Sequence, residues 1–429
     1  MLALAPDASA SKAGQGLASP RSWSGLGQDE RAVWGLCQGS GKKPYQTQVD
    51  LSEPAFKCSC PSRKFPCKHA LGLLLLWAAS GEVPVAPRPV WVEEWLASRE
   101  QRAERAAVRA EQPVKPPDPA AQAKRAAQRE ERVAAGVGEL RQWLSDLVRR
   151  GLAEAQREPW QFWELTAARM VDAQASGLAT RVRRIGNAPY SAGDAWAERM
   201  LEEASLLQLL GEAYERRELL SEPTQADVRQ LVGWSVPTEE VLAGERVRDT
   251  WAVVGQVVTE DERLRSQRTW LRGETTRRDA LILLFAPAGQ VLDPGVVFGT
   301  AVDAELVFYP GAAPLRALVA DRHGDPVVLE RLPGYASVAD ALAARAAVLA
   351  LNPWLDRFPV ALRGVVPARV GERWALVDPS GGALQLARRR DWWELAAVSG
   401  GHAIDVFAEM DGEELTVISA ASERRVVLL

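Results

Sequence analysis

Four residues with metal-binding side chains lie within twelve positions of the chain: Cys58, Cys60, Cys67 and His69. They follow the pattern C-x-C-x6-C-x-H and include three of the four cysteines and one of the three histidines. Three thiolates and one imidazole complete the tetrahedral shell of a structural zinc ion and leave no position for water or substrate. The pattern therefore predicts one structural Zn²⁺, which would stabilise the fold rather than take part in a reaction.

Two other interpretations of these cysteines are weaker. The segment carries four cations and no acidic residue: Lys57, Arg63, Lys64 and Lys68. Such cations favour thiolates, so the segment is a poor setting for reduced thiols buried in an apolar core. A redox-active pair would need a C-x-x-C spacing and a partner base, and the segment has neither. For the remaining cysteine, Cys37, we expect a buried strand residue, with a fifth or substitute ligand as the alternative.

The elements around the cluster must bring the ligands together. Residues 32–37 and 45–51 read as two strands joined by a Gly- and Lys-rich turn, which is typical of a hairpin. The apolar run from Ala70 to Trp77 reads as a helix that begins at His69. The sequence thus predicts a ββα unit, with the metal site between the hairpin and the helix.

This arrangement resembles the SWIM-type zinc finger. The turn from Gly39 to Tyr45 and the block from Cys58 to Leu76 look like bacterial members of that group, and all four family ligands have a counterpart here. The Trp-rich helical segment around residues 167–175 is similar to the middle of such proteins. The resemblance implies a finger that binds DNA or protein. It also implies an accessory role beside AAA-type ATPases and von Willebrand A-type proteins.

Composition separates the rest of the 429-residue chain into further parts. Prolines and Ala/Arg/Glu runs without an apolar stripe indicate a linker, helical periodicity follows it, and period-two alternation dominates from about residue 249. We predict a multi-domain α+β protein with a ββα zinc finger, a central all-helical domain, and a mainly antiparallel β domain that contains one helix. The expected bounds are a flexible arm at 1–22, the finger at 23–80, the linker at 81–136, the helical domain at 137–245 and the β-rich domain at 246–429.

Charge and hydropathy limit the classes of function. The net charge of −4 does not indicate a general polyanion binder, and no apolar stretch reaches membrane-spanning length. Sparse cysteines and the lack of a signal peptide predict a cytoplasmic protein. The sequence has no G-x-S-x-G or H-E-x-x-H motif and only three histidines, so we expect a non-catalytic protein.

The finger itself is locally basic. Residues 1–80 hold nine Lys or Arg against five Asp or Glu. The four cations among the ligands would contact phosphates, and Phe65 and Tyr45 would stack on unpaired bases. We therefore predict nucleic-acid binding, most simply to DNA. The alternative is a protein-docking subunit of an AAA-ATPase-associated complex that does not contact nucleic acid.

Overall fold

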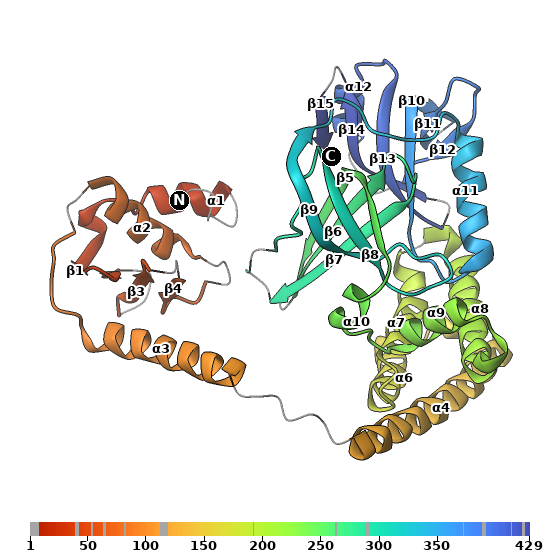
Figure 1. Ribbon diagram of the computed structural model, residues 1–429, viewed down its shortest axis with the longest axis horizontal. Coiled ribbons are helices and arrows are strands. Elements are labelled where there is room, and N and C mark those ends of the chain that lie inside the picture. Colours follow the sequence, from red (N-terminus) through yellow and green to blue (C-terminus); the bar gives the residue numbers. More distant parts are fainter. Residues whose placement is uncertain are drawn as a thin grey trace. The chain divides into compact units, whose positions relative to one another are not determined.

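The computed structural model describes residues 8–38, 43–52, 55–62, 66–80, 83–111, 119–191, 193–261, 264–287, 290, 292–371, 373–387, 392–412, 414–422 and 425–429. The chain divides into two compact units, one within residues 1–117 and a larger one of residues 118–286 and 292–429 (Figure 1). Within the described ranges, no helix combines the length and apolar composition needed to cross a membrane.

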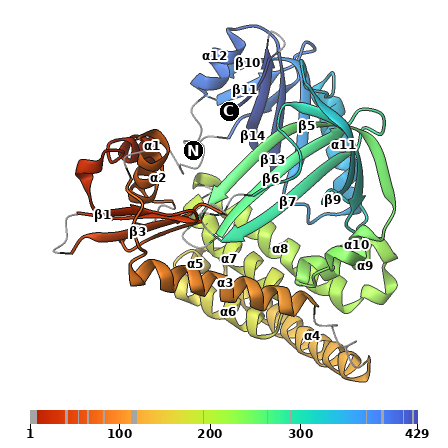
Figure 2. The same ribbon diagram turned by 60° about the vertical axis from the view of Figure 1, so that its left-hand side comes forward.

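The N-terminal unit is built on an antiparallel sheet with the strand order β1-β2-β3-β4. Its elements are α1 (Ala8–Gln15), a 3-10 turn (Pro20–Ser22), β1 (Trp23–Gln28), β2 (Ala32–Cys37), β3 (Tyr45–Asp50), β4 (Ala55–Cys58), α2 (Lys68–Ser80) and α3 (Val90–Glu111). Successive side chains of a strand point to opposite faces, so in β2 Val33 packs with α2 and Trp34 packs with α3. The two helices therefore cover opposite faces of one sheet (Figure 2). The predicted hairpin and helix are present, and β1 and β4 extend the hairpin.

The N-terminal segment differs from its prediction. The sequence indicates a flexible arm over residues 1–22, but residues 8–15 form α1, which lies against α2. Glycine permits this contact, because a Cβ on Gly14 of α1 would lie 2.9 Å from the Cβ of Leu71 in α2. The arm looks loose in sequence because Ala, Ser and Gly carry almost no apolar pattern.

The predicted linker also folds in part against the sheet. Helix α3 buries Trp95 and Leu96 beside Trp34, so this helix is anchored and does not stand free. Arg99 donates a hydrogen bond of 3.0 Å to the buried carboxylate of Asp50 in β3. Trp91 and Trp95, four residues apart in a charged stretch, indicate a short helix that docks within the same chain, and the burial of Trp95 confirms this prediction.

The larger unit begins with helices. They are α4 (Pro119–Arg150), α5 (Leu152–Ala155), α6 (Trp160–Asp172), α7 (Ser176–Ser191), a 3-10 turn (Gly193–Ala195), α8 (Trp196–Glu215), a second 3-10 turn (Arg217–Leu219), α9 (Glu222–Val232) and α10 (Thr238–Leu242). Buried residues recur along α4 at the spacing of one helix face, from Val133 to Leu147. Helices α6 and α7 pack closely at Gly186, where a Cβ would lie 2.5 Å from the ring of Trp163. Helix α4 starts within the predicted linker, which ends earlier than the composition suggests.

Two antiparallel sheets complete the larger unit. Their elements are β5 (Arg246–Glu260), β6 (Leu264–Gly273), β7 (Asp279–Pro287), β8 (Thr300–Phe308), β9 (Ala317–Val328), α11 (Val338–Leu351), β10 (Phe358–Val370), β11 (Arg373–Val377), β12 (Ala383–Gln385), α12 (Trp393–Ser399), β13 (Ile404–Asp411), β14 (Glu414–Ser422) and β15 (Arg425–Leu428). The strand orders are β7-β6-β5-β8-β9 and β12-β11-β10-β13-β14-β15. The sheets pack face to face around Trp270, Phe407 and Ile418.

One tryptophan from the β-rich part belongs to the core of the helical part. Trp354 follows α11, is 5% exposed and packs within the helical core. Its indole Nε1 donates a hydrogen bond of 2.9 Å to the carbonyl of Leu206 in α8. Arg181 of α7 donates to the Trp354 carbonyl at 3.2 Å. A side chain from the β-rich part therefore completes part of the helical core.

The predicted fold class is confirmed: N-terminal strands, a helical centre and a C-terminal antiparallel β part. The turns at Asp378–Gly382 and Asp411–Gly412 each predict a late hairpin, and both hairpins occur, as β11 with β12 and as β13 with β14. The β part holds a second short helix, α12, where the sequence predicts one helix only.

The carboxylate of Asp378 ties a hairpin loop to the start of α11. Its oxygens accept hydrogen bonds from the Ser380 hydroxyl at 2.6 Å, the Val338 amide at 2.7 Å and the Gly382 amide at 2.9 Å. These bonds, led by that of Ser380, lower the pKa of Asp378 to about 2. A depressed pKa means that the carboxylate stabilises the fold above its unfolded pKa of about 4 and loses that effect as pH falls toward 2.

We therefore expect Asp378→Asn to lower the melting temperature at neutral pH and to flatten its dependence on pH between about 4 and 2. Thermal unfolding followed by circular dichroism across this range measures both effects. Asp325→Asn, at an exposed position, is the control and should keep the wild-type profile. An unchanged profile in Asp378→Asn would show that the loop does not depend on the charge.

Candidate metal centre

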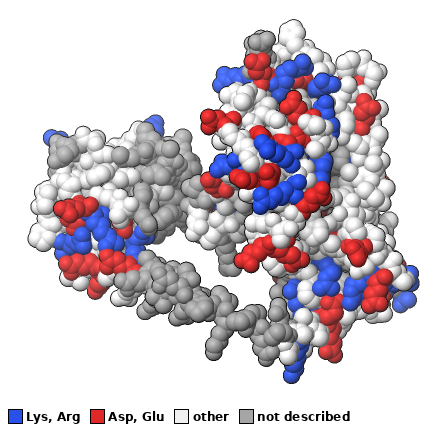
Figure 3. Space-filling model, in the orientation of Figure 1, with Lys and Arg blue, Asp and Glu red and all other residues white. Residues whose placement is uncertain are grey.

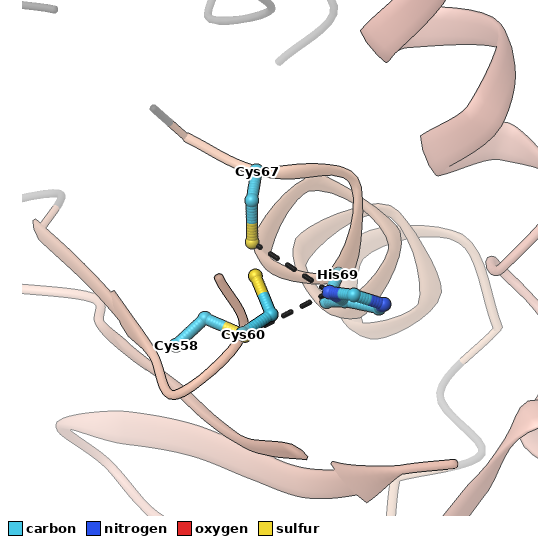
Figure 4. A group of neighbouring side chains, drawn as sticks. All are labelled: Cys58, Cys60, Cys67 and His69. Carbon is cyan, nitrogen blue, oxygen red and sulfur yellow. Dashed lines mark hydrogen bonds between the residues drawn. The ribbon is translucent and has the colours of Figure 1, made fainter. Parts of the chain in front are cut away.

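The four predicted ligands come from the end of a strand and the start of a helix. Cys58 is the last residue of β4, and Cys60 lies in the turn that follows. Cys67 immediately precedes α2, and His69 lies in its first turn. The antiparallel sheet places β4 beside β3, and α2 crosses the same sheet, so both pairs of ligands face one point (Figure 4).

The geometry fits a tetrahedral ion. The four ligand atoms all lie within 4.8 Å of one another. His69 Nδ1 is 3.8 Å from the Cys58 sulfur and 3.9 Å from the Cys67 sulfur. Zinc bonds of ordinary length would place neighbouring ligand atoms about 3.6–3.8 Å apart in a tetrahedron. The side chains thus need only small shifts to bind one ion, with Nδ1 as the histidine donor.

Groups behind the ligands favour thiolates. The backbone amides of Cys60, Ser62 and Ala70 each donate to a ligand sulfur. The Thr47 hydroxyl in β3, which is fully buried, lies 3.2 Å from the Cys58 sulfur. Such outer contacts orient ligands and stabilise their charged form.

Without a metal ion, the thiols compete for protons. Hydrogen bonds lower the pKa of Cys58 to about 3, and the Cys67 thiol is the main donor. The same contact raises the pKa of Cys67, because its proton is shared with the Cys58 thiolate, and burial raises the pKa of Cys60. A divalent cation would relieve this competition, because it stabilises all three thiolates at once.

Two residues outside the ligand set have defined places. The ring of Tyr45 lies 5.1 Å from the ring of His69, so this tyrosine packs on a ligand. Base stacking by Tyr45, as the sequence suggests, would compete with that contact. Cys37 is 1% exposed in β2 and is not part of the ligand cluster, so its prediction as a buried strand residue is confirmed.

The predicted binding residues are only partly described. Lys57 precedes the ligand Cys58, Lys68 lies between the ligands Cys67 and His69, and both side chains are exposed. Arg63, Lys64 and Phe65 lie outside the described residues, in the spacer between the ligands.

The remaining histidines differ from one another. The sequence suggests surface turns for both. His402 does lie exposed in a turn, but His323 lies within β9. Its Nε2 is 3.0 Å from a carboxylate oxygen of Glu305 on the neighbouring strand, so this prediction is wrong. Gly324 and Asp325, which indicate a turn, here belong to an irregular edge strand.

A closed donor set of three cysteines and one histidine between a sheet and a helix defines a structural zinc finger. Residues 45–78 match the family model of the SWIM zinc finger, and residues 128–232 match that of the SWIM-associated four-helix bundle domain. Searches of curated proteins and of solved structures find no significant match. Two parts of the chain are thus similar to the domains of SWIM-type zinc finger proteins, and the cluster fits one structural zinc ion.

Sequence reasoning missed the contacts behind the ligands. Thr47 and Tyr45 follow the alternation of β3, and that alternation places them on the face that carries the metal site. The pairing of Thr47 with Cys58 depends on the register between β3 and β4, and the ligand motif does not contain that register.

Proposed function

We propose that the zinc finger binds nucleic acid, with DNA as the simplest target, through the cations that flank its ligands. The observation that carries this proposal concerns Lys57 and Lys68. Both are exposed and adjacent in sequence to zinc ligands, and neither forms an ion pair with any other described residue. The zinc would fix where these two charges sit, and its own role would be structural rather than catalytic.

Two carboxylates of the same unit are already paired with arginines. Asp29 pairs with Arg88, and Asp50 pairs with Arg99 at 3.0 Å and with Arg31 at 3.7 Å. Although burial opposes the shift, the Ser52 and Arg99 side chains help lower the pKa of Asp50. These acids therefore do not offset the charge on Lys57 and Lys68.

The rest of the unit is electrostatically mixed. Figure 3 shows Lys and Arg side chains beside Asp and Glu on the face of the N-terminal unit that it presents. A phosphate contact that does not depend on base sequence needs cations without acidic partners. The segment that holds the zinc ligands, residues 57–69, is therefore a better candidate for the binding surface than the rest of the unit. In this proposal Arg63 and Lys64 supply two more phosphate contacts, and Phe65 stacks on a base.

Equilibrium binding of a labelled duplex and a labelled single strand across a salt series tests the proposal. For a duplex, each lost phosphate contact reduces the slope of log K against log salt by about 0.9. Changing Lys57, Arg63, Lys64 and Lys68 together to Gln should reduce that slope by up to about 3–4 and weaken binding at low salt. Elemental analysis should still show zinc, because no ligand is changed.

The matched control changes four exposed cations of α4 to Gln: Lys124, Arg125, Arg132 and Arg149. It has the same change in net charge and should keep the wild-type slope. Equal losses in both variants would indicate a general charge effect. Absence of binding at low salt would leave the finger as a protein-docking module, for which an AAA-type ATPase or a von Willebrand A-type protein is the proposed partner.

A further inference from the structure

The larger unit contains a cleft of about 680 Å³ between its helices and its sheets. Its lining comes from α7, α8 and α9 on one side and from β6, β7 and the loop before β9 on the other. Figure 1 shows these helices in the lower part of the larger unit, with the sheets above them. The volume is in the range of small-molecule and side-chain pockets.

One wall of the cleft is apolar. Trp270, Leu281, Leu283 and Leu315 contribute to it, and Trp354 lies at the helical side. The amide of Leu281 donates to the carbonyl of Leu315 at 2.7 Å, which fixes this wall by joining β7 to the segment before β9. A ligand with an aliphatic stem would bury apolar surface here.

The arginines inside the cleft already have carboxylate partners. Arg184 pairs with Glu203 and Asp356, Arg199 pairs with Glu203 and Asp411, and Arg268 and Arg357 pair with Glu409. One further cation, Arg316, is exposed at the rim and lies over the ring of Tyr309. Each arginine named inside the cleft is therefore already in an ion pair, which disfavours binding of an anion there.

Two carboxylates in the cleft, in contrast, still have oxygen atoms that can accept hydrogen bonds. The Glu203 side chain is 3% exposed, and its Oε2 has no hydrogen-bond partner although Oε1 binds two arginines. Asp227 of α9 accepts one hydrogen bond, from the Ala312 amide at 2.8 Å, and forms no ion pair with the described part of the chain. Burial raises the pKa of Asp227, which shows that water solvates this carboxyl group poorly. A buried acceptor without a donor is costly, so Glu203 Oε2 favours a ligand that donates. The half-buried carboxylate of Asp227, which accepts one backbone hydrogen bond and forms no ion pair with the described residues, can accept a further hydrogen bond from the same ligand.

We infer that this cleft binds a cationic group, an ammonium or guanidinium carried on an aliphatic stem. The cation would donate to Glu203 and Asp227, and the stem would lie along Trp270 and the leucines of β7. The site lies in the other unit from the zinc finger and does not depend on the nucleic-acid proposal. The cation has two possible sources: a free amine, or a Lys or Arg side chain of a protein partner.

Isothermal titration calorimetry of the full-length protein tests this inference with four probes: agmatine, pentylamine, pentanoate and the peptide acetyl-Leu-Arg-Leu-amide. We expect one or more of the three cations to bind and pentanoate not to bind. Because each variant removes a charged hydrogen bond to the cation, Glu203→Gln and Asp227→Asn should each lower the affinity for the cation by about tenfold or more. Binding of the small amines alone identifies a free amine as the source, and a clear preference for the peptide identifies a protein side chain.

The control is Glu164→Gln, which removes the same charge from an ion pair with Arg183, outside the cleft lining. It should keep wild-type affinity. Thermal unfolding checks that each variant is folded. If Glu203→Gln is unstable, the affinity of Asp227→Asn, which breaks no ion pair, decides the outcome. The inference is overturned if none of the cations binds at millimolar concentration, if pentanoate binds as well as pentylamine, or if both cleft variants keep wild-type affinity.

Discussion

Replacing Cys58 by alanine is expected to release zinc and to unfold the N-terminal unit while the larger unit stays folded. A structural zinc ion contributes on the order of 10 kcal/mol in small fingers, which is comparable to the whole stability of a domain. The apolar clusters on the two faces of the N-terminal sheet are small, and β4 and α2 meet at the metal ligands. Loss of the ion therefore removes the contact that fixes α2 against the sheet.

Elemental analysis should fall from about one zinc per chain to none, and limited proteolysis should cut within residues 23–80. Cys37→Ala is the matched control: it removes a buried cysteine that does not belong to the ligand cluster, so zinc should stay bound. A Cys58→Ala protein that keeps its zinc, or that loses zinc but resists protease, would contradict a structural role for the ion.

Replacing Trp354 by alanine should cost the larger unit about 3–5 kcal/mol, the usual loss for a buried tryptophan. The indole is almost fully buried in the helical core, and the change also leaves the Leu206 carbonyl without its donor. Urea unfolding followed by helical circular dichroism measures the loss.

Trp393→Ala is the control for that experiment, because this tryptophan is 74% exposed. It should change the unfolding free energy by about 0.5 kcal/mol or less. If the two variants unfold at the same urea concentration, the packing of Trp354 does not contribute to stability as the structure indicates.

The sequence predicts the zinc site well because its information is local. Cys58 to His69 form one short segment, and the ligand types alone define the coordination. Strand alternation likewise predicts the late hairpins, since the turns Asp378–Gly382 and Asp411–Gly412 separate adjacent strands. In such cases the residues that interact are near neighbours in the chain.

Interactions between distant segments are not visible in the same way. Trp91 and Trp95 indicate that the start of α3 docks on another part of the chain, but its partner, Trp34, lies about 60 residues earlier and no spacing rule identifies it. The cleft in the larger unit combines residues from Arg184 to Asp411, and no spacing rule brings these together. The unpaired Oε2 of Glu203 becomes apparent only when all hydrogen bonds around that residue are known.

The position of Trp354 shows that the matched domain and the packed helical core have different limits in the sequence. As an inherited unit, the four-helix bundle ends at residue 232, where the family match ends. The core of the folded bundle also includes Trp354, more than a hundred residues later, which belongs to the β-rich part. A gene rearrangement that moved the bundle alone would leave a gap the size of an indole in its interior. The sequence of the bundle is therefore adapted to a side chain that lies outside the matched domain.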